Sequence, residues 1–92
     1  MLFMVIESYR QGEPGPVGER FRRQGRMMPE GLRYHASWVD REGRRCFQVM
    51  EASDEALLRE WMANWSDLVA FEVIPVLTSV QFWARTELGG AA

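Results

Sequence analysis

The chain has 92 residues, enough for one domain and no more. Its composition, 47% hydrophobic and 26% charged, is that of a globular protein rather than a disordered one. The net charge of −2 argues against a dedicated nucleic-acid binder, so no nucleic-acid partner is expected. A domain of this size buries only about 60% of the surface of its unfolded chain, so a partner subunit would add stability.

The first predicted element is a strand over residues 2–9, LFMVIESY, which are mainly apolar. The apolar run stops at Glu7 and no basic residues precede it, so it is too short for a signal peptide or a membrane span. We therefore expect no membrane partner. The single cysteine, Cys46, cannot form an internal disulfide, so we expect a reducing cytoplasm. Since all eleven basic residues are arginine, the composition also fits a GC-rich bacterial genome.

A helix is expected after the loop RQGEPGP, which carries two prolines and two glycines. Pro16 suits the first helical turn, where its missing N–H costs nothing. The helix should run to about Met27. Its core-facing side chains are predicted to be Val17, Phe21 and Met28.

The stretch GLRYHASWVD, residues 31–40, alternates between apolar and polar side chains and predicts a second strand. A tight turn over residues 41–44, with Gly43 at positive φ, leads into a third strand, CFQVME. This turn pairs Arg41 with Arg44 and so sets the register of the hairpin. A slip of one residue would exchange the two faces of the hairpin. The expected pairs are Trp38 with Phe47, Ser37 with Gln48, Val39 with Cys46, Ala36 with Val49, His35 with Met50 and Tyr34 with Glu51.

A second helix is predicted within SDEALLREWMANWSD, where either Ser53 or Asp54 can cap the start. Trp61 and Trp65 recur at helical spacing beside leucines, which is typical of a buried stripe. The same two rings could stack on an aromatic ligand, although packing in the core is the simpler interpretation.

The last strand is expected over residues 69–79, and Pro75 within it cannot donate to a sheet ladder, which predicts an edge strand. Residues 1–80 therefore form a single predicted domain. Residues 81–92 form a C-terminal tail that can hold a short helix or a docking arm.

The predicted order is strand, helix, strand, strand, helix, strand. An internal sequence similarity supports this order, because FMVIES at residues 3–8 resembles FQVMEA at residues 47–52. Two such half-units make an α+β, ferredoxin-like βαββαβ sandwich, with strands one and three central and strands two and four at the edges.

Both helices should cover one face of this sheet. The side chains expected on that face are Phe3, Val5, Leu32, Tyr34, Ala36, Trp38, Phe47, Val49, Phe71, Val73 and Leu77. The remaining, open face is expected to carry Met4, Ile6, Arg33, His35, Ser37, Val39, Cys46, Gln48, Met50, Glu72, Ile74, Val76 and Thr78. That second set is too apolar to be left in water, so we expect a homodimer in which two sheets face each other, with a groove for a small molecule.

The pattern resembles the dimeric α+β barrel superfamily, which includes cofactor-independent monooxygenases and muconolactone isomerases. More closely, the chain resembles a bacterial family, domain of unknown function 3303. This resemblance rests on MLFMVIESY, PVGERFRRQGRMMPEGLRYHASWVD, CFQVMEASD and LLREWMANWSDLVAFEVIPVLTS, of which PEGL and WSDL are the most distinctive blocks. It implies the fold and dimerisation but brings no activity.

His35 is the only histidine and the candidate general base, with Arg33 or Gln48 steadying a developing oxyanion. The residues expected to bind a ligand on the open face are Arg33, His35, Ser37, Gln48, Met50 and Glu72. The main functional hypothesis is a homodimer of unassigned function that binds a small apolar or aromatic molecule there. The alternative is a cofactor-independent monooxygenase or isomerase, and the simplest interpretation of His35 is a single hydrogen bond at an interface.

The sequence gives less support to a metal site, a catalytic carboxylate pair or an arginine-rich binding site. One histidine and one cysteine cannot supply a tetrahedral metal site, so no metal and no cofactor is expected. Glu7 and Glu51 occupy equivalent ends of the two central strands and could act as a split acid and base, although marking the strand ends is the simpler interpretation. The arginine-rich run at residues 19–26 is best explained as a solvated helix face.

Overall fold

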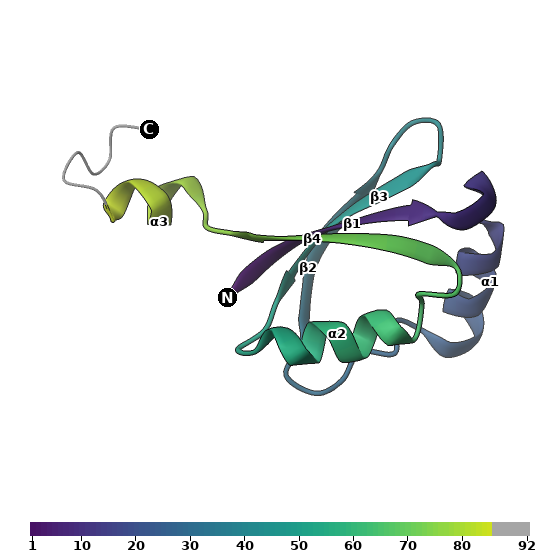
Figure 1. The fold of residues 1–92 in the computed structure, drawn as a ribbon, viewed down its shortest axis with the longest axis horizontal. Helices are drawn as coiled ribbons and strands as arrows, with labels where there is room; N and C mark the ends of the chain where they lie inside the picture. The colour runs from purple at the N-terminus through teal and green to yellow at the C-terminus, as the bar shows by residue number, and fades with distance from the viewer. Residues whose placement is uncertain (86–92) are drawn as a thin grey trace.

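The computed structural model describes residues 1–85 of the chain (Figure 1). The order of elements is that of a ferredoxin-like βαββαβ fold with a short helix added at the end, which confirms the predicted α+β class. The elements are β1 (Leu2–Tyr9), the 3₁₀ turn η1 (Arg10–Gly12), α1 (Gly15–Gln24), β2 (Arg33–Val39), β3 (Arg45–Glu51), α2 (Glu55–Ala63), β4 (Val69–Val76) and α3 (Ser79–Ala84).

The four strands form one antiparallel sheet in the order β2-β3-β1-β4. The central position of β1 and β3 and the edge position of β4, predicted from Pro75, are confirmed. In Figure 1, α2 lies along one face of this sheet and α1 lies near the end at which β1 finishes. Among the described residues, no helix lies over the opposite face, which we call the open face.

The predicted register of the hairpin is confirmed for the residues near the turn and is wrong for those farther from it. Trp38 pairs with Phe47, and Gly43 adopts the expected positive φ of 73°. The register then shifts between Tyr34 and Ala36, where a β-bulge leaves His35 unpaired in the ladder. Because of this extra residue, Tyr34 pairs with Met50 and Arg33 pairs with Glu51. The expected pairs Tyr34–Glu51 and His35–Met50 are therefore wrong.

The face assigned to the hairpin is also wrong, except at Tyr34 and at Arg33, which pairs with Glu51 opposite Leu2 on the open face. On β1, Phe3 and Val5 are fully buried under the helices, and they pair with Met50 and Gln48 of β3. Met50, Gln48 and Cys46 are therefore buried on the helix side. The residues that move to the open face are Ala36, Trp38, Phe47 and Val49, and those that leave it are Ser37, Val39, Cys46, Gln48 and Met50.

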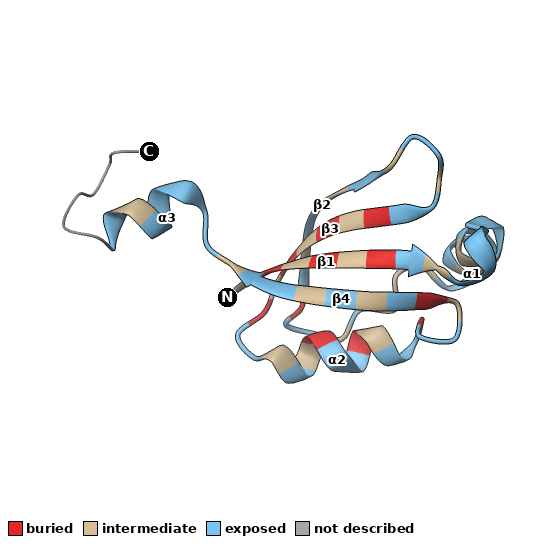
Figure 2. Ribbon diagram, turned by 45° about the horizontal axis from the view of Figure 1, so that its top comes forward, coloured by how far each residue is buried: buried red, intermediate tan, exposed pale blue. Residues whose placement is uncertain are grey.

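The core lies between the sheet and α2, where Figure 2 shows the buried positions facing one another. Leu58 and Trp61 of α2 are buried against the sheet, as the helical stripe predicts, and Trp65 follows just after the helix. The buried apolar cluster consists of Phe3, Val5, Leu32, Met50, Ala52, Leu58, Trp61, Trp65 and Val69.

Helix α1 is shorter than predicted because Gly25, with φ of 67°, ends it. Phe21 and Met28 are 42% and 37% exposed, so their predicted core role is wrong, whereas Val17 packs against the core. The Arg20 guanidinium binds both carboxylate oxygens of Asp67, each at 2.7 Å, and so ties α1 to the loop after α2.

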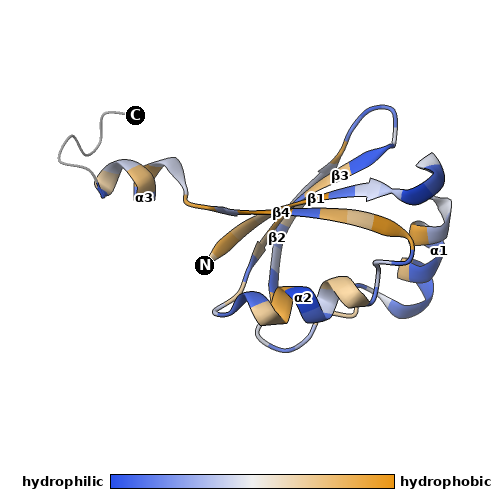
Figure 3. Ribbon diagram, viewed as in Figure 1, coloured by the Kyte–Doolittle hydropathy of each residue, from blue (hydrophilic) through white to orange (hydrophobic). Residues whose placement is uncertain are grey.

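The predicted short helix of the tail is present as α3, which begins two residues before the expected tail boundary at residue 81. Thr78 and Gln81 form a reciprocal capping box, with hydrogen bonds of 3.0 and 2.9 Å. Figure 1 shows α3 standing beyond the end of the sheet, and Figure 3 shows that apolar residues continue along β4 toward it. Val80 and Phe82 are 79% and 42% exposed there.

The start of α2 gives the first prediction, because the structure selects Asp54 over Ser53 as the cap. The Asp54 carboxylate accepts a hydrogen bond of 2.9 Å from the backbone N–H of Ala56. We expect Asp54→Ala to lower the free energy of unfolding by about 1 kcal/mol, as measured by urea denaturation. Ser53→Ala is the matched control and should change it little. Equal losses in the two variants would contradict the assignment of the cap.

Candidate functional site

A cavity of about 320 Å³ lies on the helix side of the sheet, and we call it the α1 cavity. Its apolar walls come from both long helices and the segments beside them. They consist of Pro14, Val17, Gly18 and Phe21 around α1, and of Trp61 and Trp65 at α2. The polar groups that reach the cavity are Glu7, Tyr9, Arg26, Ser37, Cys46 and Gln48.

The α1 wall follows from helical spacing. Residues 14, 17, 18 and 21 recur at intervals of three and four, which places their side chains on one side of a helix. Gly18 stands in the middle of this stripe, and a Cβ built there would meet no heavy atom within 4 Å. The glycine therefore leaves space in the wall of the cavity.

Glu7 lies on the sheet side of the cavity because it has the same alternation phase as Phe3 and Val5. Its side chain is only 7% exposed, and that of its neighbour Gln48 is 5% exposed. Gln48 Nε2 donates a hydrogen bond of 2.6 Å to Glu7 Oε2. The two buried polar groups thus satisfy each other across β1 and β3.

The second carboxylate oxygen of Glu7 is available to the cavity. Within residues 1–85, no side chain or backbone group donates a hydrogen bond to Glu7 Oε1. In the same part of the chain, no fully buried polar side-chain atom lacks a partner. Oε1 must therefore keep some accessible surface, and the α1 cavity that Glu7 lines provides it.

Burial raises the pKa of Glu7 from 4.5 to about 7, against the lowering effects of the Gln48 hydrogen bond and the Arg26 charge. The carboxyl group can therefore both accept and release a proton near neutral pH. Tyr9 and Cys46 line the same cavity, and burial raises their pKa values to about 12 and about 11. Both stay protonated at neutral pH and act as neutral groups beside Glu7.

The connection between α1 and β2 is fixed to α2 by tryptophans. The indole Nε1 groups of Trp61 and Trp65 donate to the same acceptor, the backbone carbonyl of Arg26, at 3.0 and 3.1 Å. Asn64 Nδ2 donates to the carbonyl of the next residue, Met27, at 3.1 Å. The Arg26 guanidinium lies 3.7 Å from the centre of the Tyr34 ring, a cation–π contact that holds its charge at the cavity.

The structure divides the residues predicted to bind a ligand. Ser37 and Gln48 line the α1 cavity, whereas Met50 is fully buried in the core. Glu72 stands on the open face of β4, where it pairs with Ile6. These residues therefore do not surround one open-face groove.

His35 lies apart from the α1 cavity. Its side chain is 40% exposed, and Nε2 lies 2.7 Å from Glu51 Oε1. Arg33 approaches the same carboxylate at 4.0 Å, and the His35 hydrogen bond lowers the pKa of Glu51. In the antiparallel pair, Glu51 lies opposite Leu2, so Glu7 and Glu51 stand at opposite ends of β1 and β3 rather than side by side.

Sequence reasoning missed Glu7 and Arg26 as parts of one site. The signal for Glu7 is an acidic residue in phase with the two core residues that precede it on a strand, Phe3 and Val5. No local pattern identifies Arg26, because its place depends on hydrogen bonds from residues 35 and 39 positions away.

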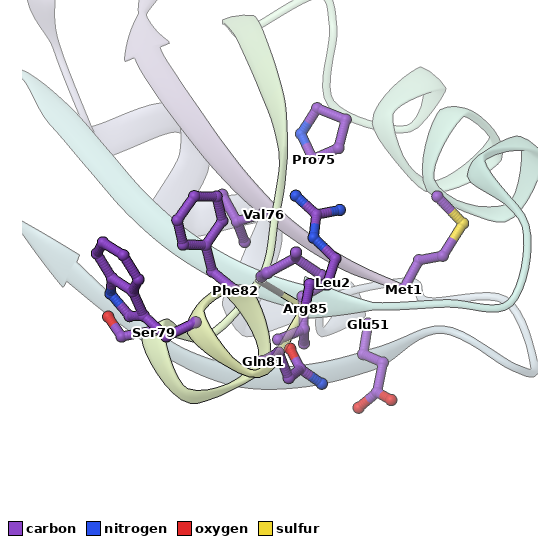
Figure 4. Close-up of a pocket in the computed structure, with 11 residues that line it drawn as sticks. Met1, Leu2, Glu51, Pro75, Val76, Ser79, Gln81, Phe82 and Arg85 are labelled. Atoms are coloured by element: carbon purple, nitrogen blue, oxygen red, sulfur yellow. The ribbon is translucent and has the colours of Figure 1, made fainter. Parts of the chain in front are cut away.

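A second hollow, the α3 hollow, of about 650 Å³, lies between α3 and the end of the sheet. Figure 4 shows Phe82 and Arg85 of the α3 segment beside Val76 and Leu2. Every residue that lines it is exposed or half-buried, so the α3 hollow is a surface feature rather than a built binding site.

Residues 1–85 contain neither a candidate metal cluster nor a candidate membrane-spanning helix. No group of three or more His, Cys, Asp or Glu side chains there could hold a metal ion. In the same residues, no helix has both the length and the apolar character to cross a membrane.

Comparison with known families gives one match. The model of a family described as domain of unknown function (DUF3303) matches residues 1–87. Comparisons with curated proteins and with solved structures gave no significant match.

The raised pKa of Glu7 makes stability depend on pH. Below pH 4.5 the carboxyl is protonated in both the folded and the unfolded chain, so burying it carries no ionisation cost. Between pH 4.5 and about 7 the unfolded chain ionises first, and the free energy of unfolding falls by up to about 3 kcal/mol. We expect Glu7→Gln to be more stable than the wild type at pH 8 by up to that amount and nearly equal at pH 4.5, as measured by urea denaturation.

The matched control is Glu51→Gln, which removes a carboxylate whose pKa is lowered by folding. It should give no stabilisation at pH 8. A Glu7→Gln protein with the same stability difference at both pH values would contradict the buried, raised carboxyl.

Proposed function

The chain belongs to the DUF3303 family, and we propose that it binds a small, largely aromatic molecule in the α1 cavity. The observation that carries this proposal is a buried carboxylate, Glu7, with one oxygen open to an aromatic-walled cavity. Small-molecule sites commonly combine apolar walls with a few placed polar groups, and about 320 Å³ lies at the lower end of their volumes.

The chemistry of the cavity favours a neutral ligand with a hydrogen-bond donor. Phe21, which is 42% exposed, offers flat apolar surface where the buried Trp61 and Trp65 also line the cavity, and Glu7 Oε1 offers an acceptor. A phenolic or enolic hydroxyl next to an aromatic ring matches both. The proposed ligand site therefore lies on the helix side of the sheet, which carries Gln48 and Ser37, and not on the open face expected from the sequence.

The enzymatic alternative with His35 as general base finds less support than ligand binding. His35 is exposed and already engaged with Glu51, and it does not line the α1 cavity. The bacterial origin and the cytoplasmic location remain predictions from the sequence.

The open face supports the expected homodimer. After the correction of the hairpin, it carries Trp38 and Ile74, which are 58% and 41% exposed, together with the half-buried Met4, Phe47 and Val49. Four strands of seven or eight residues cover roughly 25 by 20 Å. A stable interface buries about 800 Å² per partner, so the open face of the sheet alone supplies more than half of the required area.

A direct binding measurement tests the ligand proposal. We expect 2-naphthol, a neutral aromatic alcohol, to bind and to quench the fluorescence of Trp61 and Trp65. Gly18→Leu places a side chain into the cavity wall and should weaken binding by at least about tenfold. Gly15→Leu is the matched control, because Gly15 is also an uncrowded glycine of α1 but does not line the cavity. Absence of saturable quenching, or equal affinity in the two variants, would overturn the proposal.

The dimer is tested by sedimentation velocity at micromolar protein concentration. We expect the wild type to sediment as a dimer and Ile74→Arg to sediment as a monomer, because a charge on the open face opposes its burial. Val39→Arg is the control: Val39 is an exposed β-branched strand residue, 55% accessible, on the other face of the sheet. A monomeric wild type, or a dimer of Ile74→Arg with unchanged affinity, would contradict the interface.

A further inference from the structure

We propose that Glu7 is the acid–base residue of a proton-transfer reaction on a small, enolisable aromatic carbonyl compound, with Arg26 stabilising the enolate. This inference rests on the proposed ligand binding in the α1 cavity and adds an activity to it. It stands on the placement of three groups around one cavity: the open oxygen of Glu7, the guanidinium of Arg26 and the aromatic walls.

Glu7 has the arrangement that a general base requires. Gln48 holds one carboxylate oxygen at 2.6 Å and so fixes the direction of the group, which leaves Oε1 for the substrate. The flanking Tyr9 and Cys46 remain neutral at physiological pH, so neither competes as a base. The pKa of Glu7, about 7, matches a group that must take up and return a proton within one turnover.

Arg26 supplies the positive charge that the reaction needs. Its charge is already felt at Glu7, whose pKa it lowers. Stacking on Tyr34 and the two indole hydrogen bonds to its own carbonyl fix the residue in place before any ligand arrives. A cation held in advance near a site of developing negative charge stabilises an enolate with little reorganisation.

The proton transfer is balanced within the substrate and Glu7. In the first step, the C–H bond next to the carbonyl breaks, and its proton passes to Glu7 Oε1. The electron pair of that bond forms the enolate, with negative charge on the carbonyl oxygen near Arg26. In the second step, the protonated carboxyl first exchanges its proton with solvent and then delivers a proton to the same carbon, or it passes the abstracted proton to the γ carbon of a conjugated enolate. The first outcome is exchange and the second is isomerisation, and neither consumes an oxidant or a reductant.

The experiment uses 2-tetralone, an enolisable ketone close in size and shape to 2-naphthol, dissolved in deuterated buffer with the full-length protein. Loss of the proton signal at the carbon between the ring and the carbonyl is followed by nuclear magnetic resonance. We expect the wild type to accelerate this exchange over buffer and Glu7→Gln to lower the protein-dependent rate by about 100-fold. The rate should rise with pH around a midpoint near 7, as the carboxyl ionises.

Two control variants separate Glu7 from the other candidates. Glu51→Gln and His35→Ala alter the exposed pair outside the cavity, and both should keep the wild-type exchange rate. Arg26→Met should slow exchange and also raise the midpoint of its pH profile, because the charge that lowers the pKa of Glu7 is lost. A change in folding alone would not move that midpoint.

The results distinguish this inference from the binding on which it rests. If 2-naphthol binds the wild type and Glu7→Gln alike but exchange is no faster with the wild type, binding stands and the acid–base role of Glu7 is overturned. Exchange that survives in Glu7→Gln and is lost in His35→Ala would overturn it in favour of His35. If 2-naphthol does not bind the wild type, the proposed ligand site falls, and this inference falls with it.

Discussion

Two indole N–H groups converge on one backbone carbonyl, and the candidate site depends on this contact. Trp61 lies in the last turn of α2 and Trp65 just beyond its end, and both reach the carbonyl of Arg26. Buried indoles need an acceptor, and here the acceptor belongs to the connection between α1 and β2. The contact therefore fixes that connection on α2, sets the position of α1, and leaves the α1 cavity between them. The Arg20–Asp67 ion pair adds a second tie between the same parts.

The buried polar pair of Glu7 and Gln48 lowers the stability of the fold relative to a pair of apolar residues at the same positions. An apolar residue at Glu7 and another at Gln48 would extend the core and remove the desolvation of a carboxyl group. The chain instead places a carboxyl group there, satisfies one oxygen and leaves the other facing a cavity. Buried titratable groups with shifted pKa values cluster at functional sites, which is why Glu7 marks this site better than the more visible His35.

The sequence predicts the architecture well because alternation, helical spacing and turn residues are local. The strands, the two longer helices, the edge position of β4 and the turn at Gly43 all follow from such patterns. The faces of the hairpin do not, because both of its sides are apolar enough to be buried. The similarity of residues 3–8 to residues 47–52 misled, since Phe3 points into the core and Phe47 points to the open face.

The candidate site could be predicted only in part, for a related reason. Gln48 and Ser37 were expected to bind a ligand, and both line the α1 cavity, but on the face opposite to the expected one. The bulge at His35 shifts the alternation of faces along β2 by one residue. The pattern of apolar and polar residues over 31–40 does not predict this bulge. Once β3 is turned over, the open face loses the polar Ser37 and Gln48 and gains the aromatic Trp38 and Phe47, so it becomes more apolar than the sequence suggested.

The corrected sheet gives β1 two separate roles on its two faces. Phe3, Val5 and Glu7 face the helices, whereas Met4 and Ile6 face the side proposed to meet a second copy. Because neighbouring residues of a strand share one backbone, burial of Met4 and Ile6 in a dimer would also restrain Glu7 on the other side. Assembly and chemistry would then use different surfaces and one strand. Such an arrangement would help to fix the carboxyl group in a small domain, which buries a smaller share of its surface than a large one.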